Sequence, residues 1–61
     1  MENKILYYRK LKKLSQAKLA ESAGISRTHL NRIESGIVDP SLSVANSIAK
    51  ALGKQISEIF L

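Results

Sequence analysis

Cysteine is absent from this chain of 61 residues, and His29 is its only histidine. Disulfide bonds and thiolate metal sites are therefore excluded, and a single imidazole does not make a metal site. We expect neither a metal nor a cofactor. The lack of cysteine also suits a reducing compartment, and a cytoplasmic location is expected.

Long apolar runs are missing as well. No run approaches the roughly 20 residues that are needed to cross a bilayer. The apolar stretch near the N-terminus covers only residues 5–8, which is far too short for a signal peptide. We therefore expect no membrane-spanning segment and no membrane partner.

Breakers of regular structure are few, with one proline and three glycines. No stretch alternates apolar and polar residues for long enough to indicate a strand, so we predict an all-α fold. A single domain is expected over residues 1–61. Its five helices are predicted near residues 3–12, 16–23, 27–35, 42–52 and 57–60.

Serine and glycine mark the predicted helix ends. A serine hydroxyl can accept a hydrogen bond from a first-turn amide, whereas glycine readily takes the left-handed conformation that follows a helix. The expected N-caps are Ser15, Ser26 and Ser41. The residues expected just past the helix ends are Gly24, Gly36 and Gly53.

Apolar residues at helical spacing predict a small core. A chain this short folds only with tight helix packing or with help from a second copy. His29 is expected at the edge of the buried face, in a packing or boundary role. The predicted core residues are Ile5, Tyr8, Leu11, Leu19, Ala20, Leu30, Ile33, Ala45, Ile48, Ala49, Leu52, Ile56, Ile59 and Phe60.

Positive charge is concentrated in the first half of the chain. Residues 1–32 carry eight Lys and Arg against two Glu, whereas residues 33–61 carry two Lys against three acidic residues. Such a basic half favours a polyanionic partner, either nucleic acid or an anionic membrane surface. Charge that serves only solubility is the alternative.

Residues 16–36 have the pattern of a helix-turn-helix. Ala20 allows the third helix to approach the second closely, and Gly24 can take the positive φ that a tight turn requires. Leu30 and Ile33 then anchor the third helix to the core. A generic helical hairpin needs the glycine but not the other residues at these offsets.

The face of the third helix opposite its buried residues is polar and free of acid. Arg can donate two hydrogen bonds to guanine, Asn can pair with adenine, and the Thr methyl can meet a thymine methyl. Ordinary polar exposure remains the alternative. The residues expected to contact bases in a major groove are Arg27, Thr28, Asn31 and Arg32.

A second set of residues is expected to contact phosphates. Gln16 opens the second helix, where free amides and the helix dipole favour an anion. Alternatively, Gln16 stands there only because glutamine forms helices well. The complete set of expected phosphate contacts is Gln16, Ser26, Ser35 and Lys13.

Three segments resemble the phage-repressor-like helix-turn-helix family, the Cro/Xre-type (Cro/C1-type) bacterial transcription regulators. They are LSQAKLAESAGIS, the IESG after the third helix, and DPSLSVANSIAKALGKQISEIF. The similarity runs from about residue 5 to residue 60. It implies a compact five-helix lambda-repressor-like domain that binds double-stranded DNA, in a cytoplasmic protein of a bacterium or phage associated with the nucleoid.

The resemblance also implies a structural ion pair between Arg9 and Glu34, since family members commonly pair an Arg of the first helix with a Glu at the end of the recognition helix. The alternative is that both charges are solvated, in which case they would contribute little to stability. Lys13 departs from the family, which often has Gly at this position. A strain of about 1 kcal/mol is expected there.

The loop after Gly36 is apolar where the family is often polar or basic, which argues against phosphate contacts from this loop. Exposed apolar residues at this end of the chain suit a two-fold dimer interface, which the family often places here. The residues expected in that interface are Ile37, Val38, Val44, Ile56, Phe60 and Leu61.

The leading hypothesis is therefore a sequence-specific regulator of transcription, a repressor or autoregulator that reads a near-palindromic operator as a homodimer through residues 27–35. An antagonist protein is a further candidate partner. An antitoxin or adaptor that keeps the motif as a scaffold is the second hypothesis. RNA binding ranks lower, because only three aromatic residues are present. An enzyme is not expected, because no nucleophile–base pair or phosphate loop is found.

Overall fold

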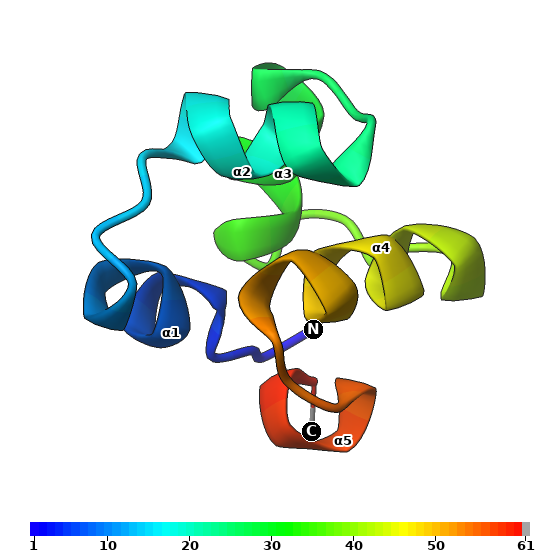
Figure 1. The fold of residues 1–61 in the computed structure, drawn as a ribbon. Coiled ribbons are helices and arrows are strands. Elements are labelled where there is room, and N and C mark those ends of the chain that lie inside the picture. Colours follow the sequence, from blue (N-terminus) through cyan, green and yellow to red (C-terminus); the bar gives the residue numbers. More distant parts are fainter. Residues whose placement is uncertain (61) are drawn as a thin grey trace.

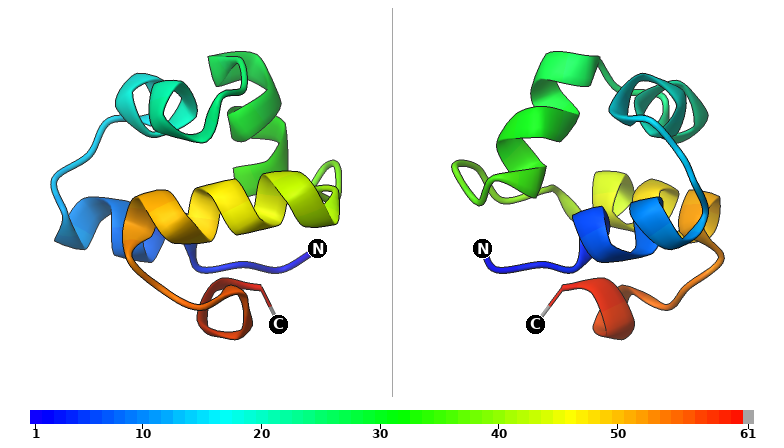
Figure 2. Two further views of the ribbon diagram at one scale, coloured as in Figure 1. Left: turned by 45° about the vertical axis from the view of Figure 1, so that its right-hand side comes forward. Right: turned by 90° about the vertical axis from the view of Figure 1, so that its left-hand side faces the viewer.

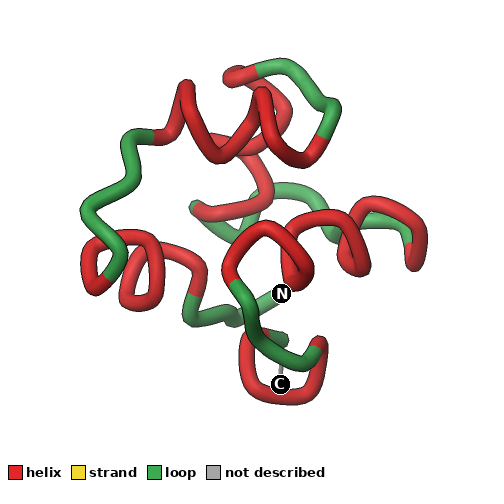
Figure 3. The backbone as a smooth tube through the Cα atoms, in the orientation of Figure 1, coloured by secondary structure: helices red, strands yellow, loops and turns green. Residues whose placement is uncertain are grey.

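The computed structural model describes residues 1–60, and these residues form five α-helices around one apolar core (Figure 1). Helices α2 and α3 lie together at one end of the molecule, α4 crosses its middle, and α5 lies at the opposite end. Loops join the helices, and Figure 3 shows no strand within the described residues. The predicted all-α fold is confirmed. The helices are α1 (Ile5–Leu11), α2 (Gln16–Ala23), α3 (Arg27–Glu34), α4 (Leu42–Leu52) and α5 (Ile56–Ile59).

Side chains cap the helices where serine was expected. The hydroxyl oxygen accepts a hydrogen bond from the amide three residues ahead, at 3.1 Å for Ser15, 3.0 Å for Ser26 and 3.2 Å for Ser41. These three N-caps are confirmed. Helix α5 begins instead with a capping box of Gln55 and Glu58, a Gln-x-x-Glu pattern that our sequence analysis missed.

Four helices end in the same hydrogen-bonded motif. A residue with positive φ donates its amide to the carbonyl three residues earlier, and the next amide reaches the carbonyl five residues earlier. Gly24, Gly36 and Gly53 hold this position after α2, α3 and α4, with φ of 73°, 80° and 67°. Lys13 holds it after α1, with φ of 57°. The strained position predicted for Lys13 is therefore present.

The core is formed by apolar residues from all five helices. Leu19 and Leu30 are fully buried. The core residues predicted on α4 are confirmed, because all four are buried: Ala45, Ile48, Ala49 and Leu52. Helix α4 packs against both α2 and α5, and α2 also packs against α3. Within residues 1–60, no helix is long and apolar enough to cross a membrane.

Helix α1 differs from the prediction at its start. It begins at Ile5 rather than near Asn3, because the backbone of Asn3 pairs with Phe60 in an isolated antiparallel bridge. The Lys4 amide also donates to the Ile59 carbonyl at 2.8 Å. These bonds hold the residues before α1 beside α5, as both views in Figure 2 show.

Two side chains predicted at or near the core lie outside it. Leu11 is 63% exposed, because the chain reverses at Lys13 and Leu14 packs against the core in its place. His29 is exposed as well rather than at the boundary of the core. It follows Ser26 in the first turn of α3, before the buried Leu30, on the side that faces solvent.

Candidate nucleic-acid interface

The turn between α2 and α3 consists of three residues, Gly24, Ile25 and Ser26. Gly24 takes φ of 73°, which is strained for other residues, and Ile25 packs against the core. Ala20 is only 2% exposed, so its small side chain lies in the interior where α2 meets the rest of the fold. The two helices are thus held at a fixed angle, and this fixes the direction in which the outer face of α3 points.

The outer face of α3 is polar and positively charged. Leu30 and Ile33 are fully buried, so the residues on the other side of the helix point to solvent. Ion pairs within residues 1–60 involve neither Arg27 nor Arg32, so both guanidinium groups can take a new partner without losing an old one. The exposed residues of this face are Arg27, Thr28, Asn31, Arg32 and Ser35.

The two serines next to α3 differ in what they can donate. The Ser26 oxygen accepts the His29 amide at 3.0 Å, which leaves its O–H free to donate to an anion. The Ser35 hydroxyl already donates to the Asn31 carbonyl at 2.7 Å. A phosphate contact from Ser35 therefore requires that this internal hydrogen bond be exchanged.

The start of α2 lies beside further basic residues. Gln16 is half-buried at the first position of α2, and Lys13 is exposed in the preceding turn. No acidic residue occupies the first turn of α2 or of α3, so the positive ends of both helix dipoles are uncompensated. Lys18 pairs with Glu21 at 3.4 Å, but both side chains are exposed and the pair contributes little.

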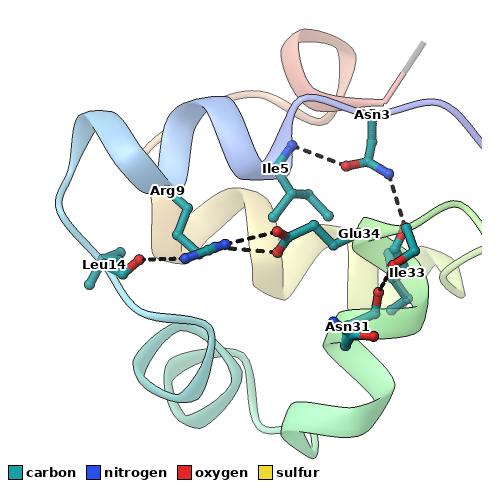
Figure 4. Close-up of polar contacts among 8 residues, drawn as sticks. Asn3, Ile5, Arg9, Leu14, Asn31, Ile33 and Glu34 are labelled. Atoms are coloured by element: carbon teal, nitrogen blue, oxygen red, sulfur yellow. Dashed lines mark hydrogen bonds and ion pairs between the residues drawn. The ribbon is translucent and has the colours of Figure 1, made fainter.

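An ion pair connects α1 to the last turn of α3 (Figure 4). Arg9 donates from Nη2 to Glu34 Oε1 at 2.8 Å and from Nε to Oε2 at 3.3 Å. Its Nη1 donates to the Leu14 carbonyl at 3.0 Å. The two side chains are only 14% and 9% exposed, so loss of either partner would leave a charge largely buried without its counter-ion.

This arrangement agrees with three comparisons with known proteins. A helix-turn-helix family profile matches residues 5–59. The chain belongs to the Cro/C1-type helix-turn-helix family of DNA-binding transcriptional regulators.

Relatives of this chain include transcriptional regulators and a repressor. The chain is 48% identical over 61 residues to an uncharacterized HTH-type transcriptional regulator of Methanocaldococcus jannaschii, and the match covers 100% of this chain and 92% of that protein. It is 49% identical over 51 residues to the immunity repressor protein of Bacillus phage phi105, covering 84% of this chain but 35% of the repressor.

Solved structures share the same fold. The N-terminal DNA-binding domain of SinR from Bacillus subtilis matches with a TM-score of 0.81 and 31% identity, covering 87% of this chain and 78% of that one. The clp gene regulator ClgR from C. glutamicum matches with a TM-score of 0.80 and 26% identity, covering 87% and 69%. The fold and the DNA-binding class are therefore established for the helix-turn-helix protein.

The apolar residues expected at a dimer interface are exposed to different extents. Ile37 is 71% exposed. The four others that the structure describes, Val38, Val44, Ile56 and Phe60, are partly buried and pack against the core. Leu61 lies outside the described residues. Leu42 at the start of α4, which we did not predict, is 73% exposed and lines an open groove between α4 and α5 with Ile56.

The role of Asn3, whose side chain contacts the end of α3, was also not predicted from the sequence (Figure 4). The partner is a backbone carbonyl 30 residues away, and no local pattern indicates such a contact. The only signal was the position of a capping-type residue two places before the first apolar residue of α1. The Leu14 carbonyl, which accepts a hydrogen bond from Arg9 five residues earlier, was also missed.

Proposed function

We propose that the protein is a sequence-specific regulator that reads duplex DNA with α3 and acts as a repressor or autoregulator. The outer face of α3 carries this proposal, because Arg27, Thr28, Asn31 and Arg32 are exposed on a helix of fixed orientation and no acid lies among them. Arg and Asn are the side chains that pair best with guanine and adenine in the major groove. The similarity to a phage immunity repressor supports the repressor role.

Phosphate contacts fix the register of this helix on the duplex. Gln16 and Ser26 stand at the first turns of α2 and α3, where free amides and the dipole favour an anion. Lys13 and Ser35 extend the contact on either side. These contacts position the protein, whereas the four base contacts of α3 select the sequence.

A homodimer completes the proposed reader. Two copies of α3 about 34 Å apart would enter successive major grooves of a near-palindromic site. The proposed interface is formed by Ile37 with the partly buried Val38, Val44, Ile56 and Phe60, and by Leu61. Control of activity then comes from the concentration of the protein in the cytoplasm, at the nucleoid, or from an antagonist protein that occupies the same apolar end.

Two alanine variants separate base reading from phosphate binding. Arg32→Ala should weaken binding to the preferred duplex by roughly 1–3 kcal/mol and relax specificity at one base pair, with little effect on unrelated DNA. Lys13→Ala should weaken binding to both duplexes alike and reduce the slope of log affinity against log salt by about 1. Titrations with both duplexes at several salt concentrations measure both effects. Equal losses for Arg32→Ala on the two duplexes would refute its role as a base contact.

A further inference from the structure

The Asn3 side chain joins the start of α1 to the last turn of α3 (Figure 4). Its Oδ1 accepts a hydrogen bond from the Ile5 amide at the start of α1, at 3.1 Å. Its Nδ2 donates to the Ile33 carbonyl in the last turn of α3, at 2.9 Å. The first amides of a helix have no partner within the helix, and Asn3 supplies one to the Ile5 amide. The Ile33 carbonyl also accepts the Gly36 amide at 3.0 Å, so the bond from Asn3 is a second one to that carbonyl and ties it to a residue outside α3.

The backbone of Asn3 is held independently of α3. It pairs with Phe60 in the antiparallel bridge, and the next amide, that of Lys4, donates to the Ile59 carbonyl at 2.8 Å. Asn3 is therefore fixed to α5 and to the start of α1, and its amide group reaches from this fixed point to the end of α3.

Asn3 and Arg9 hold the same turn of α3 in different ways. Arg9 contacts the side chain of Glu34, whose own bonds can rotate. Asn3 contacts the backbone carbonyl of Ile33, one residue away. A bond to the backbone restricts both the tilt and the rotation of the helix more directly, and Asn31 and Arg32 immediately precede this carbonyl.

We infer that Asn3 is a positioning residue for the recognition helix: it fixes the C-terminal end of α3 relative to α5 and so sets how α3 presents Asn31 and Arg32 to DNA. This inference rests on the proposed function. Asn3 itself touches no base. It acts through the Ile33 carbonyl, and it links α5 mechanically to the DNA-reading face.

The variant Asn3→Asp tests the inference with a minimal change of shape. It keeps an oxygen for the Ile5 amide and removes the Nδ2 donor to the Ile33 carbonyl. Asn46→Asp is the matched control, since Asn46 is exposed on α4 and the change in charge is the same. If Asn3→Asp does not fold, Asn3→Ser replaces it, because serine keeps the capping oxygen and is too short to reach Ile33.

Two measurements on the whole protein are compared, both below the melting temperature of every variant. One is amide hydrogen exchange in α3 without DNA. The other is the ratio of the dissociation constant for unrelated duplex to that for the preferred duplex. We expect the last turn of α3 to exchange faster in Asn3→Asp and the ratio to fall between about 2-fold and 30-fold. Asn46→Asp should change neither.

The outcomes separate this inference from the proposed function. If the wild-type protein binds all duplexes equally, the proposed function and the inference are both overturned, and no variant is needed to show this. A wild type with a clear preference, and an Asn3→Asp variant with the same ratio, overturns only the inference. In that case a lower melting temperature would show that Asn3 is merely structural.

Discussion

At the scale of single residues, Lys13 has a backbone conformation that glycine takes at the three equivalent helix ends. Its φ of 57° brings the Cβ atom of an L-residue close to the following carbonyl oxygen, at a cost of about 1–2 kcal/mol. The same residue is exposed next to the N-terminus of α2. Lys13 therefore combines an unfavourable conformation with a charge placed beside the proposed phosphate contacts.

Lys13→Gly should stabilise the fold while it weakens DNA binding. Removal of the strain outweighs the greater freedom of glycine in the unfolded chain, so we expect a gain of up to about 1 kcal/mol. For a domain of this size such a gain raises the melting temperature by up to about 4–8 °C. Thermal unfolding followed by circular dichroism measures it.

Lys13→Ala is the control for this prediction. It removes the charge but keeps a Cβ atom at positive φ, so it should lose the same DNA affinity as Lys13→Gly without the gain in stability. If the two variants melt at the same temperature, the strain at this position is not a significant cost.

At the scale of elements, one side chain caps the start of α3 and is also proposed to contact a phosphate. The Ser26 oxygen caps the helix by accepting the His29 amide, and its O–H remains free to donate to a phosphate. Asn and Asp cap helices about as well as Ser does. Substitutions at this position can therefore alter the charge at the proposed phosphate contact while the helix end stays intact.

Ser26→Asp should bind DNA poorly yet remain as stable as the wild type. A carboxylate is favoured at a helix N-terminus, whereas like charges brought together cost several kcal/mol, so affinity for any duplex should fall by more than about tenfold. Ser26→Asn, which caps without charge, should retain most of the affinity. DNA titrations and thermal melts of both variants test this. Similar affinities for Asp and Asn would show that no phosphate approaches the start of α3.

Local patterns in the sequence predicted the elements that depend on local interactions. The three serine caps, the glycine at the turn between α2 and α3, and the buried stripe of α4 follow from contacts three to five residues apart. The fate of Leu11 did not follow from spacing alone, because α1 ends there and the reversal at Lys13 brings Leu14 to the core instead.

Long-range contacts of the candidate site could not be predicted in this way. The exposed face of α3 follows from helical geometry once Leu30 and Ile33 are assigned to the core. The Asn3 contact with Ile33 and the bridge to Phe60 join residues 30 or more positions apart, and no periodicity encodes them. The Arg9–Glu34 contact was expected only from the family resemblance.

At the scale of the whole molecule, the proposed dimer depends on apolar surface that the single chain leaves exposed. Ile37 is 71% exposed after the end of α3, so it contributes little to the fold of the monomer. Burial against a second copy would remove this side chain from water, and full burial of an isoleucine contributes roughly 1.5–3 kcal/mol.

Ile37→Ser should weaken the dimer without weakening the fold. We expect a dimerisation constant reduced by more than about tenfold and a nearly unchanged melting temperature at low protein concentration. Leu11→Ser is the control, because Leu11 is 63% exposed on α1 and outside the proposed interface. Sedimentation equilibrium compares the two variants. Equal association of both would place the interface elsewhere.

Selection of the purified protein on a randomised pool of duplex DNA, at near-physiological salt and with Arg32→Ala run in parallel, tests the central claim most directly. Our account predicts enrichment of one near-palindromic site by the wild type, and the same site with relaxed preference at one base pair of each half for Arg32→Ala. Absence of any enriched sequence with the wild type would contradict sequence-specific reading by α3. The motif would then be a scaffold for a protein partner.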